Sequence, residues 1–255
     1  MSRSDENAGG VSYDVPGYEA FRRRAGDDKL SGNQKAGFPD AFRAGRSAII
    51  LADIATKLPA LSRPGAAVLD IGPGCGELAR HIIEATGLAN QALTMIDGPE
   101  ILAQLPRAGH VRNIEGPFPA CLSRFTPSLG PFSAILVYSV LQYVFAEGNL
   151  FGFIDAALDL LAEDGALLLG DIPNASMRKR FLASPSGERH HAQHYAGQKL
   201  PEVRFNAPEV AQIDDAVVLG IVARARAAGF QAFVVPQAAD LPMANRREDI
   251  LIKRP

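Results

Sequence analysis

The residues best suited to chemistry form a short glycine-rich turn, residues 72–76. An almost continuous apolar run, residues 66–71, precedes the turn and predicts a strand that is buried on both faces of a parallel sheet. Glycine has no Cβ, so the backbone of the turn can approach a ligand closely, and the helix that follows can point its free N–H groups at the same ligand. The turn therefore predicts a binding site for a nucleotide or an adenosyl group.

The spacing of the glycines narrows the class of ligand. Gly72, Gly74 and Gly76 form Gly-x-Gly-x-Gly, one residue tighter than the dinucleotide fingerprint Gly-x-Gly-x-x-Gly, which disfavours a nicotinamide oxidoreductase. No Gly-Lys-Ser/Thr follows, which excludes the phosphate-binding loop of the nucleoside triphosphatases. The alternative is a tight turn that binds nothing, but three glycines weaken a fold unless a close backbone approach is needed.

The stretch Leu69–Gly76 resembles the first motif of the class I methyltransferases that use S-adenosylmethionine. The resemblance extends from about Ala66 to Pro255. It implies an α/β fold, a three-layer sandwich with a seven-stranded, mostly parallel sheet (the Rossmann-like methyltransferase fold), and S-adenosyl-L-methionine as cofactor. The residues that would cradle the aminoacyl end of the cofactor are Gly72, Pro73, Gly74 and Gly76, in a loop ordered by Asp70.

Polar side chains at the ends of later strands complete the expected cofactor site. Asp97 lies about twenty residues beyond the turn, where the topology brings a carboxylate beside the ribose of a bound nucleoside. Its alternative role is the N-cap of the next helix, and the two roles are compatible. The resemblance implies that Glu115, after the third strand, lies near the adenine amino group, and that Tyr138 and Ser139, at the end of the fourth, line the pocket.

Four residues are candidates for a general base that deprotonates the methyl acceptor: Asp171, His190, His191 and His194. Asp171 follows the fifth strand, at the sheet edge where substrates bind, and a histidine titrates near neutral pH. The alternatives are a turn cap for Asp171 and ordinary solvated side chains for the histidines. His190 and His194 lack a third ligand at a fixed spacing, so we expect no metal.

Alternating strands and helices must bring these residues together. Apolar runs predict strands, and apolar stripes at helical spacing predict helices. The expected strands are residues 66–71, 91–97, 110–115, 132–140, 166–169, 230–235 and 249–253. The expected helices are residues 40–57, 78–87, 101–105, 149–161 and 206–229. This alternation argues for a three-layer α/β sandwich, and the resemblance implies that the last strand runs antiparallel beside the fifth.

Two regions lie outside the alternation. Residues 1–60 are expected to form an N-terminal helical cap or extension, in which Tyr13, Tyr18 and Phe21 recur at helical intervals. This segment would either cover the mouth of the active site or simply pack on the surface of the domain. The S-adenosylmethionine-binding domain takes residues 61–255. It contains a poorly periodic insert, about residues 172–207, where the family commonly places substrate-recognition elements.

The composition sets outer limits on the class of protein. With 26 Lys and Arg against 28 Asp and Glu among 255 residues, no charge field attracts nucleic acid or an anionic membrane. Two cysteines are too few for a disulfide framework. No apolar stretch reaches the length of a membrane span, and the N-terminus lacks the apolar core of a signal peptide, so we expect a soluble cytoplasmic protein. We expect no nucleic-acid or membrane partner and leave a homodimer open.

The sequence thus favours an enzyme that transfers a methyl group from S-adenosylmethionine to an oxygen or nitrogen of a small molecule or glycan. The alternative from a different class is a non-catalytic S-adenosylmethionine-binding regulator or partner subunit. Turnover distinguishes the two, because both would keep the cofactor pocket.

Overall fold

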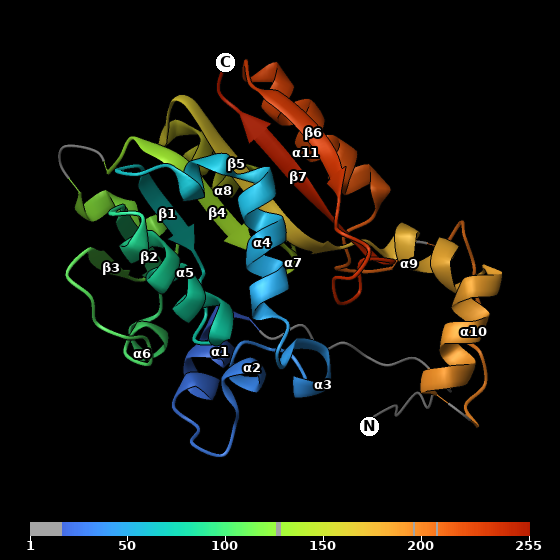
Figure 1. Ribbon diagram of the computed structural model, residues 1–255. Coiled ribbons are helices and arrows are strands. Elements are labelled where there is room, and N and C mark those ends of the chain that lie inside the picture. Colours follow the sequence, from blue (N-terminus) through green and yellow to red (C-terminus); the bar gives the residue numbers. More distant parts are fainter. Residues whose placement is uncertain (1–16, 126–128, 196, 208) are drawn as a thin grey trace, which may run out of the picture.

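The structure is a computed structural model that describes residues 17–125, 129–195, 197–207 and 209–255, apart from the side chains of residues 41 and 42. A seven-stranded sheet with the order β3-β2-β1-β4-β5-β7-β6 forms its centre (Figure 1). The strands are β1 (Ala67–Ile71), β2 (Ala92–Asp97), β3 (Val111–Glu115), β4 (Phe132–Tyr138), β5 (Leu161–Pro173), β6 (Gln231–Pro236) and β7 (Arg247–Lys253). Neighbouring strands run parallel except that β7 is antiparallel to both β5 and β6. The expected fold class is confirmed.

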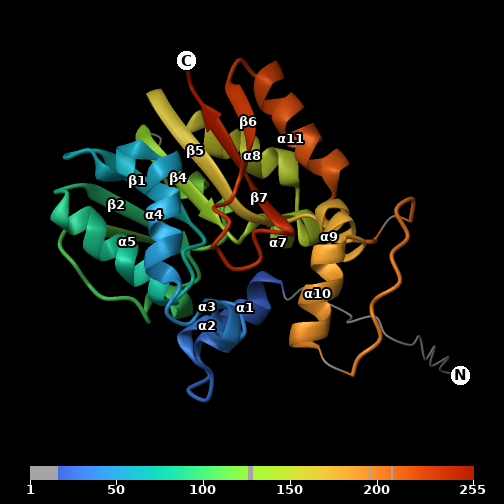
Figure 2. The same cartoon turned by 45° about the vertical axis from the view of Figure 1, so that its right-hand side comes forward.

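Helices cover both faces of the sheet and make it the middle of three layers (Figures 1 and 2). On one face, α4 (Ser47–Lys57) and α5 (Glu77–Leu88) share an apolar core with the sheet, and on the other face α8 (Leu150–Asp159) and α11 (Asp215–Ala227) do so. Successive side chains of a strand point to opposite faces. In β4, accordingly, Leu136 packs in the first core and Ile135 in the second.

Two helices differ in extent from the sequence prediction. The predicted helix 40–57 is split at Gly45, whose positive φ of +68° interrupts the helix and leaves α3 (Asp40–Arg43) separate from α4. The predicted helix 206–229 begins only at Asp215, because Asp214 caps it by accepting a hydrogen bond from the Val217 N–H. Phe42 and Tyr13, two residues of the predicted helical stripes, lie outside the described side chains and residues, respectively.

The insert after β5 contains two capped helices, which the poor apolar periodicity did not predict. These are α9 (Ala175–Leu182), capped by Asn174, and α10 (Pro185–His194), capped by Ser184. Their faces are mostly polar, so a search for apolar stripes misses them. Both figures show α10 projecting to one side of the sheet, beyond α9.

The N-terminal helices α1 (Tyr18–Ala25) and α2 (Gly32–Lys35), with α3, lie beside the carboxyl ends of the parallel strands (Figure 1). Arg22 of α1 forms an ion pair of 2.6 Å with Glu100 of α6 (Pro99–Leu102). Phe21 packs edge-on against Tyr143 of α7 (Leu141–Glu147), with 4.7 Å between ring centroids. Among the residues described, none of the helices has both the length and the apolar character needed to cross a membrane.

Candidate functional site

A cavity of about 540 Å³ opens at the carboxyl ends of β1, β2 and β4. The strand order reverses between β1 and β4, and ligands of open parallel sheets bind at that point. The walls of the cavity include the loop 72–76 after β1 (hereafter the glycine loop), residues 96–101 at the end of β2, residues 116–119 after β3, residues 138–153 from the end of β4 to α8, and the N-terminal helices. This placement makes the cavity the candidate site.

The glycine loop owes its path to its glycines. Gly72 and Gly74 have φ of +74° and +64°, a backbone region that L side chains rarely adopt. A Cβ at Gly72 would also lie only 2.6 Å from Cγ2 of Val140. The loop is anchored where the Gly72 N–H donates to the Ile96 carbonyl, over 2.8 Å. Helix α5 starts directly after the loop, and no side chain caps it, so N–H groups of its first turn are free for a ligand.

Asp97 ties the glycine loop to the end of β2. Its Oδ2 accepts from the Gly74 N–H at 3.1 Å, and its Oδ1 accepts from the Gly98 N–H at 2.7 Å. The residue lines the cavity although it is only 8 % exposed. Burial raises the pKa of Asp97 to about 6, against the opposing effect of the two N–H groups. Each carboxylate oxygen keeps a second lone pair for a hydroxyl group in the cavity.

Asp70 lies beneath the loop, at the end of β1, and is 2 % exposed. Its Oδ2 is buried and has no hydrogen-bond partner among the described residues. Burial, with a contribution from the negative charge of Asp97, raises the pKa of Asp70 to about 8. Asp70 is not among the cavity-lining residues, so its carboxyl group does not face the cavity.

Ser139 and Asp171, at the ends of β4 and β5, both adopt the left-handed backbone conformation, with φ of +61° and +58°. Such strain persists where the surroundings hold it in place. The Ser139 N–H donates to the Gly170 carbonyl at 2.9 Å, and its hydroxyl donates to the Asp171 carboxylate. Ser139 lines the cavity beside Tyr138, whose pKa is raised by burial.

Asp171 is the centre of a buried ionic cluster. Its carboxylate is paired with the Arg43 guanidinium and, at 2.9 Å, with Arg247. Gln237 donates to its other oxygen at 3.4 Å, and the Asp171 N–H donates to Asp249 at 2.8 Å. One carboxylate is thus shared by two guanidinium groups. It does not line the cavity, and its geometry fits a residue that positions Arg43 and Ser139.

Comparison with solved structures places this architecture among methyltransferases. BpumL, a plantazolicin methyltransferase crystallised with a triazolic desmethylPZN analogue and S-adenosylhomocysteine, has a TM-score of 0.58 at 11% identity, covering 93% of this chain and 98% of that one. The N-methyltransferase NodS from Bradyrhizobium japonicum, also with S-adenosylhomocysteine, gives 0.54 at 17% identity, with coverages of 93% and 98%. A methyltransferase from Aquifex aeolicus that depends on S-adenosylmethionine gives 0.52 at 12%, with coverages of 89% and 100%.

This chain has the fold of the class I methyltransferases. The likeness lies in the path of the chain, because the identities are low. No sequence profile of a protein family matches the chain, and no curated protein matches it.

Of the residues predicted for the cofactor, seven line the cavity, whereas Asp70, beneath the glycine loop, and Glu115 do not. Those that line it are Gly72, Pro73, Gly74, Gly76, Asp97, Tyr138 and Ser139. Glu115 does not, contrary to the prediction, because it ends the edge strand β3 with its side chain exposed to solvent. The cavity wall beyond β3 is built by Gly116, Pro117, Phe118 and Pro119 instead.

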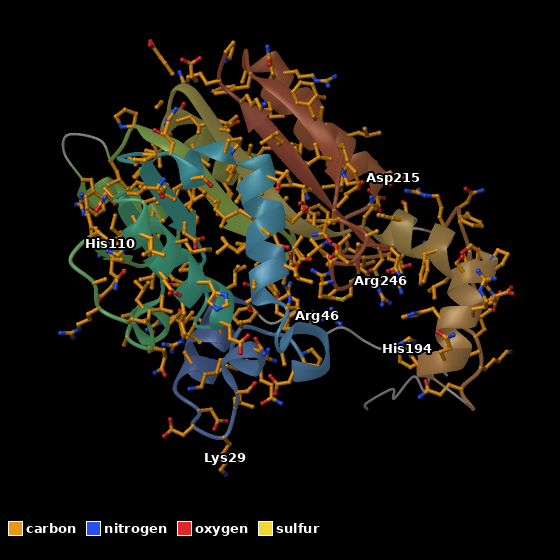
Figure 3. All side chains as sticks on the ribbon, in the orientation of Figure 1. Lys29, Arg46, His110, His194, Asp215 and Arg246 are labelled. Carbon is orange, nitrogen blue, oxygen red and sulfur yellow. The ribbon has the colours of Figure 1, made fainter. Side chains whose placement is uncertain are left out.

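The predicted catalytic histidines are also outside the cavity. All three lie on α10, and Figure 3 shows His194 far out on this helix. The ring of His191 contacts the Gln198 carbonyl at 3.1 Å and stacks on Tyr195, while His190 and His194 lie ring to ring at 4.2 Å. These contacts hold the insert together, so the structure corrects the expectation that the histidines face the acceptor. Within the described ranges, no group of three potential metal ligands occurs.

The sequence did not single out several residues of the cavity wall, among them Phe38, Arg43 and Phe118. Arg43 has no local signal, since its partners Ser139 and Asp171 are 96 and 128 positions away. Phe38 precedes Pro39 in a segment that reads as a loop. Phe118 lies three residues after Glu115. As an apolar residue just after the third strand, it could have been predicted as a wall for the adenine ring.

Proposed function

We propose that this chain is a methyltransferase that transfers a methyl group from S-adenosyl-L-methionine to an oxygen or nitrogen of a small molecule or glycan. The proposal rests on one observation, the hydrogen bond from the Gly74 N–H of the glycine loop to the Asp97 carboxylate. This bond lies at the sheet edge where the strand order reverses. It joins the two elements that an adenosyl cofactor needs, a close backbone approach and a carboxylate.

The residues present fit the cofactor. The backbone of the glycine loop would hold its aminoacyl end, with no side chain at Gly72 or Gly74 to block the approach. Asp97 keeps lone pairs for the two ribose hydroxyls. Ile101 and Phe118 supply apolar walls beyond β2 and β3, which suit a planar base.

When bound, S-adenosylmethionine supplies a methyl carbon on a positively charged sulfur, which becomes a neutral thioether when an acceptor lone pair takes the methyl group. The protein's task is therefore to hold the acceptor in line and to exclude water. The cavity wall fits this task because it is mostly apolar and its charged groups are few. None of the described residues that line it is a histidine, so proximity and orientation are the main sources of rate in this proposal.

Residues 18–43 are proposed to act as a cap over the site. Tyr18, Phe21, Phe38 and Arg43 of this segment line the cavity. The segment is held to the domain at both ends, by the Tyr18 N–H on Glu147 at 3.3 Å and by Arg43 on Ser139 at 3.0 Å. Helix α4, although part of the predicted extension, packs in the core beside the sheet.

The proposal is tested by calorimetric titration with S-adenosylhomocysteine and with NAD. We expect micromolar binding of the adenosyl ligand and none of NAD, and the reverse result would overturn the proposal. Incubation with a methyl-tritiated donor and a metabolite extract then tests turnover. Binding without transfer of label in any extract would point to the non-catalytic alternative.

A further inference from the structure

One part of the cavity wall is aromatic and holds a single arginine, Arg43. The aromatic wall is formed by Phe21, Phe38, Tyr138 and Tyr143. Phe21 and Tyr143 pack edge-on. The guanidinium carbon of Arg43 lies 4.0 Å from the ring centroid of Phe38 and 5.8 Å from that of Tyr138. A flat cation is therefore fixed between rings at the ends of β4 and β5.

Arg43 has unused capacity to donate hydrogen bonds. Its bonds to Ser139 and Asp171 both come from Nη2. Its Nε is buried and has no partner among the residues described, while the side chain is only 9% exposed. A buried N–H donor without an acceptor destabilises the folded state, whereas an exposed donor binds water instead. A ligand with an acceptor group would therefore be stabilised at this position.

Arg43 is the cation of the buried cluster that a negatively charged ligand group in the cavity can reach. Asp171 is shared by Arg43 and Arg247, so one carboxylate faces two guanidinium groups. Lys57 pairs with Asp249 at 2.7 Å and with Asp53 at 2.5 Å, so the three cations of the cluster face three carboxylates. Of the two arginines, only Arg43 lines the cavity. Its charge is the part of the cluster that a ligand can reach.

We propose that the methyl acceptor is an aromatic acid, with its carboxylate on Arg43 and its ring against the aromatic wall. The inference rests on the proposed function and narrows the acceptor from the broader class of small molecules and glycans. A planar carboxylate matches the guanidinium fork, and the rings offer stacking surface that a sugar, rich in hydroxyl groups, would leave unused. A single negative charge fits best, because Glu77, Asp97 and Glu147 also line the cavity.

The probe experiment compares three compounds on the protein saturated with S-adenosylhomocysteine: 2-naphthoate, 2-naphthamide and acetate. We expect 2-naphthoate to bind at least tenfold tighter than either of the others, because only this compound offers both charge and ring. Equal binding of the naphthamide would overturn the role of Arg43, and equal binding of acetate would overturn the role of the aromatic wall. The same series without S-adenosylhomocysteine separates a failure of this inference from a failure of cofactor binding.

Two variants form a matched pair. Arg43→Gln and Arg247→Gln each remove one guanidinium from Asp171, so they share the effect on the buried cluster. Only Arg43→Gln changes the cavity wall. We expect the preference for naphthoate over naphthamide to fall at least tenfold in Arg43→Gln and to persist in Arg247→Gln, with Arg43→Lys intermediate. Loss of the preference in both glutamine variants, or in neither, would contradict the inference. A folded state is verified by thermal melting of each variant.

Discussion

At the scale of single residues, Asp97 serves the loop and the cavity together. It accepts N–H groups from Gly74 and Gly98 while lining the cavity. We predict that Asp97→Ala weakens S-adenosylhomocysteine binding about tenfold or more, because hydrogen bonds to a charged group contribute roughly 1.5–3 kcal/mol. Calorimetric titration measures the change.

The neighbouring strand provides the control for this prediction. Glu115 pairs in register with Asp97 but is exposed and absent from the cavity wall. Glu115→Ala should therefore bind S-adenosylhomocysteine as the wild type does. An Asp97→Ala protein that melts like the wild type and binds equally well would remove Asp97 from the cofactor site.

The buried acids predict an unusual pH dependence of stability. Burial raises the pKa of Asp70 to about 8 and that of Asp97 to about 6, from the usual 3.8 of an aspartate. At a pH between the usual pKa of an aspartate and these raised values, the folded state binds more protons than the unfolded state. The free energy of unfolding therefore falls as pH rises through this range. Each such proton contributes about 1.4 kcal/mol per pH unit. We predict a melting temperature that decreases from pH 5 to pH 8 and a flatter curve for Asp70→Asn.

The control for the pH series is Asp155→Asn. The Arg224 side chain lowers the pKa of Asp155, so this group is ionised in both states throughout the range. Its replacement should leave the slope unchanged. If Asp70→Asn kept the full slope, Asp70 would not be the group that holds the extra proton.

Local sequence predicted some site residues and not others for a physical reason. The strand that ends at Ile71 and the turn after it are dictated by neighbouring residues, so the glycine loop was predictable. Arg43 depends on partners that only the folded sheet brings near. Glu115 follows a strand in the expected way, but β3 is an edge strand and leaves this side chain in solvent.

At the scale of elements, the glycine loop can be tested with two glycines that have the same φ. Gly72 and Gly65 both have φ of +74°. A Cβ at Gly72 would meet Val140 at 2.6 Å, whereas one at Gly65 would have no neighbour within 4 Å. We predict that both alanine variants are destabilised by about 1–2 kcal/mol of backbone strain, and that Gly72→Ala loses further stability and S-adenosylhomocysteine affinity through the clash.

Denaturant unfolding and calorimetric titration measure the two effects. The double variant Gly72→Ala with Val140→Ala removes the clash but keeps the strain, so it should recover part of the affinity. Equal effects of Gly72→Ala and Gly65→Ala on stability and binding would show that close packing of the loop is unimportant.

The insert shows where prediction of elements failed. Residues 175–194 lack an apolar stripe, yet form two helices through side-chain caps and ion pairs such as Arg178–Glu209. Which way α10 projects is decided by packing rather than by local sequence. The histidines do lie in the insert after β5, as expected, but on a helix whose residues do not line the cavity.

At the scale of the whole molecule, Asp171 links three distant parts of the chain. It pairs with Arg43 of the N-terminal segment and Arg247 of β7, and accepts from Ser139 at the end of β4. We predict that Asp171→Asn lowers the free energy of unfolding by about 3–5 kcal/mol, because it leaves buried cations without a counter-charge. Denaturant unfolding measures the loss.

The histidine variants are the comparison for Asp171. His190→Gln and His194→Gln, on the outer helix, should change stability by less than about 0.5 kcal/mol and leave turnover unchanged. If either variant lost turnover while keeping cofactor affinity, a catalytic role for the insert would be restored. Normal stability of Asp171→Asn would mean that the cluster does not hold the segments together.

The last prediction concerns the cap, residues 18–43. The segment lines the cavity and is attached to the domain by side-chain contacts such as Arg22–Glu100 and Phe21–Tyr143 rather than by the backbone hydrogen bonds of the sheet, so local opening should be easier there than in the sheet. A ligand that binds only the folded, closed form adds about 2.7 kcal/mol of stability at a hundred times its Kd. We therefore predict that S-adenosylhomocysteine slows amide hydrogen exchange in residues 18–43 more than in α10, none of whose residues lines the cavity. Exchange is measured by mass spectrometry of peptides at equal saturation. Equal slowing in both segments would indicate general stabilisation, and no slowing in residues 18–43 would mean that the segment does not close over the ligand.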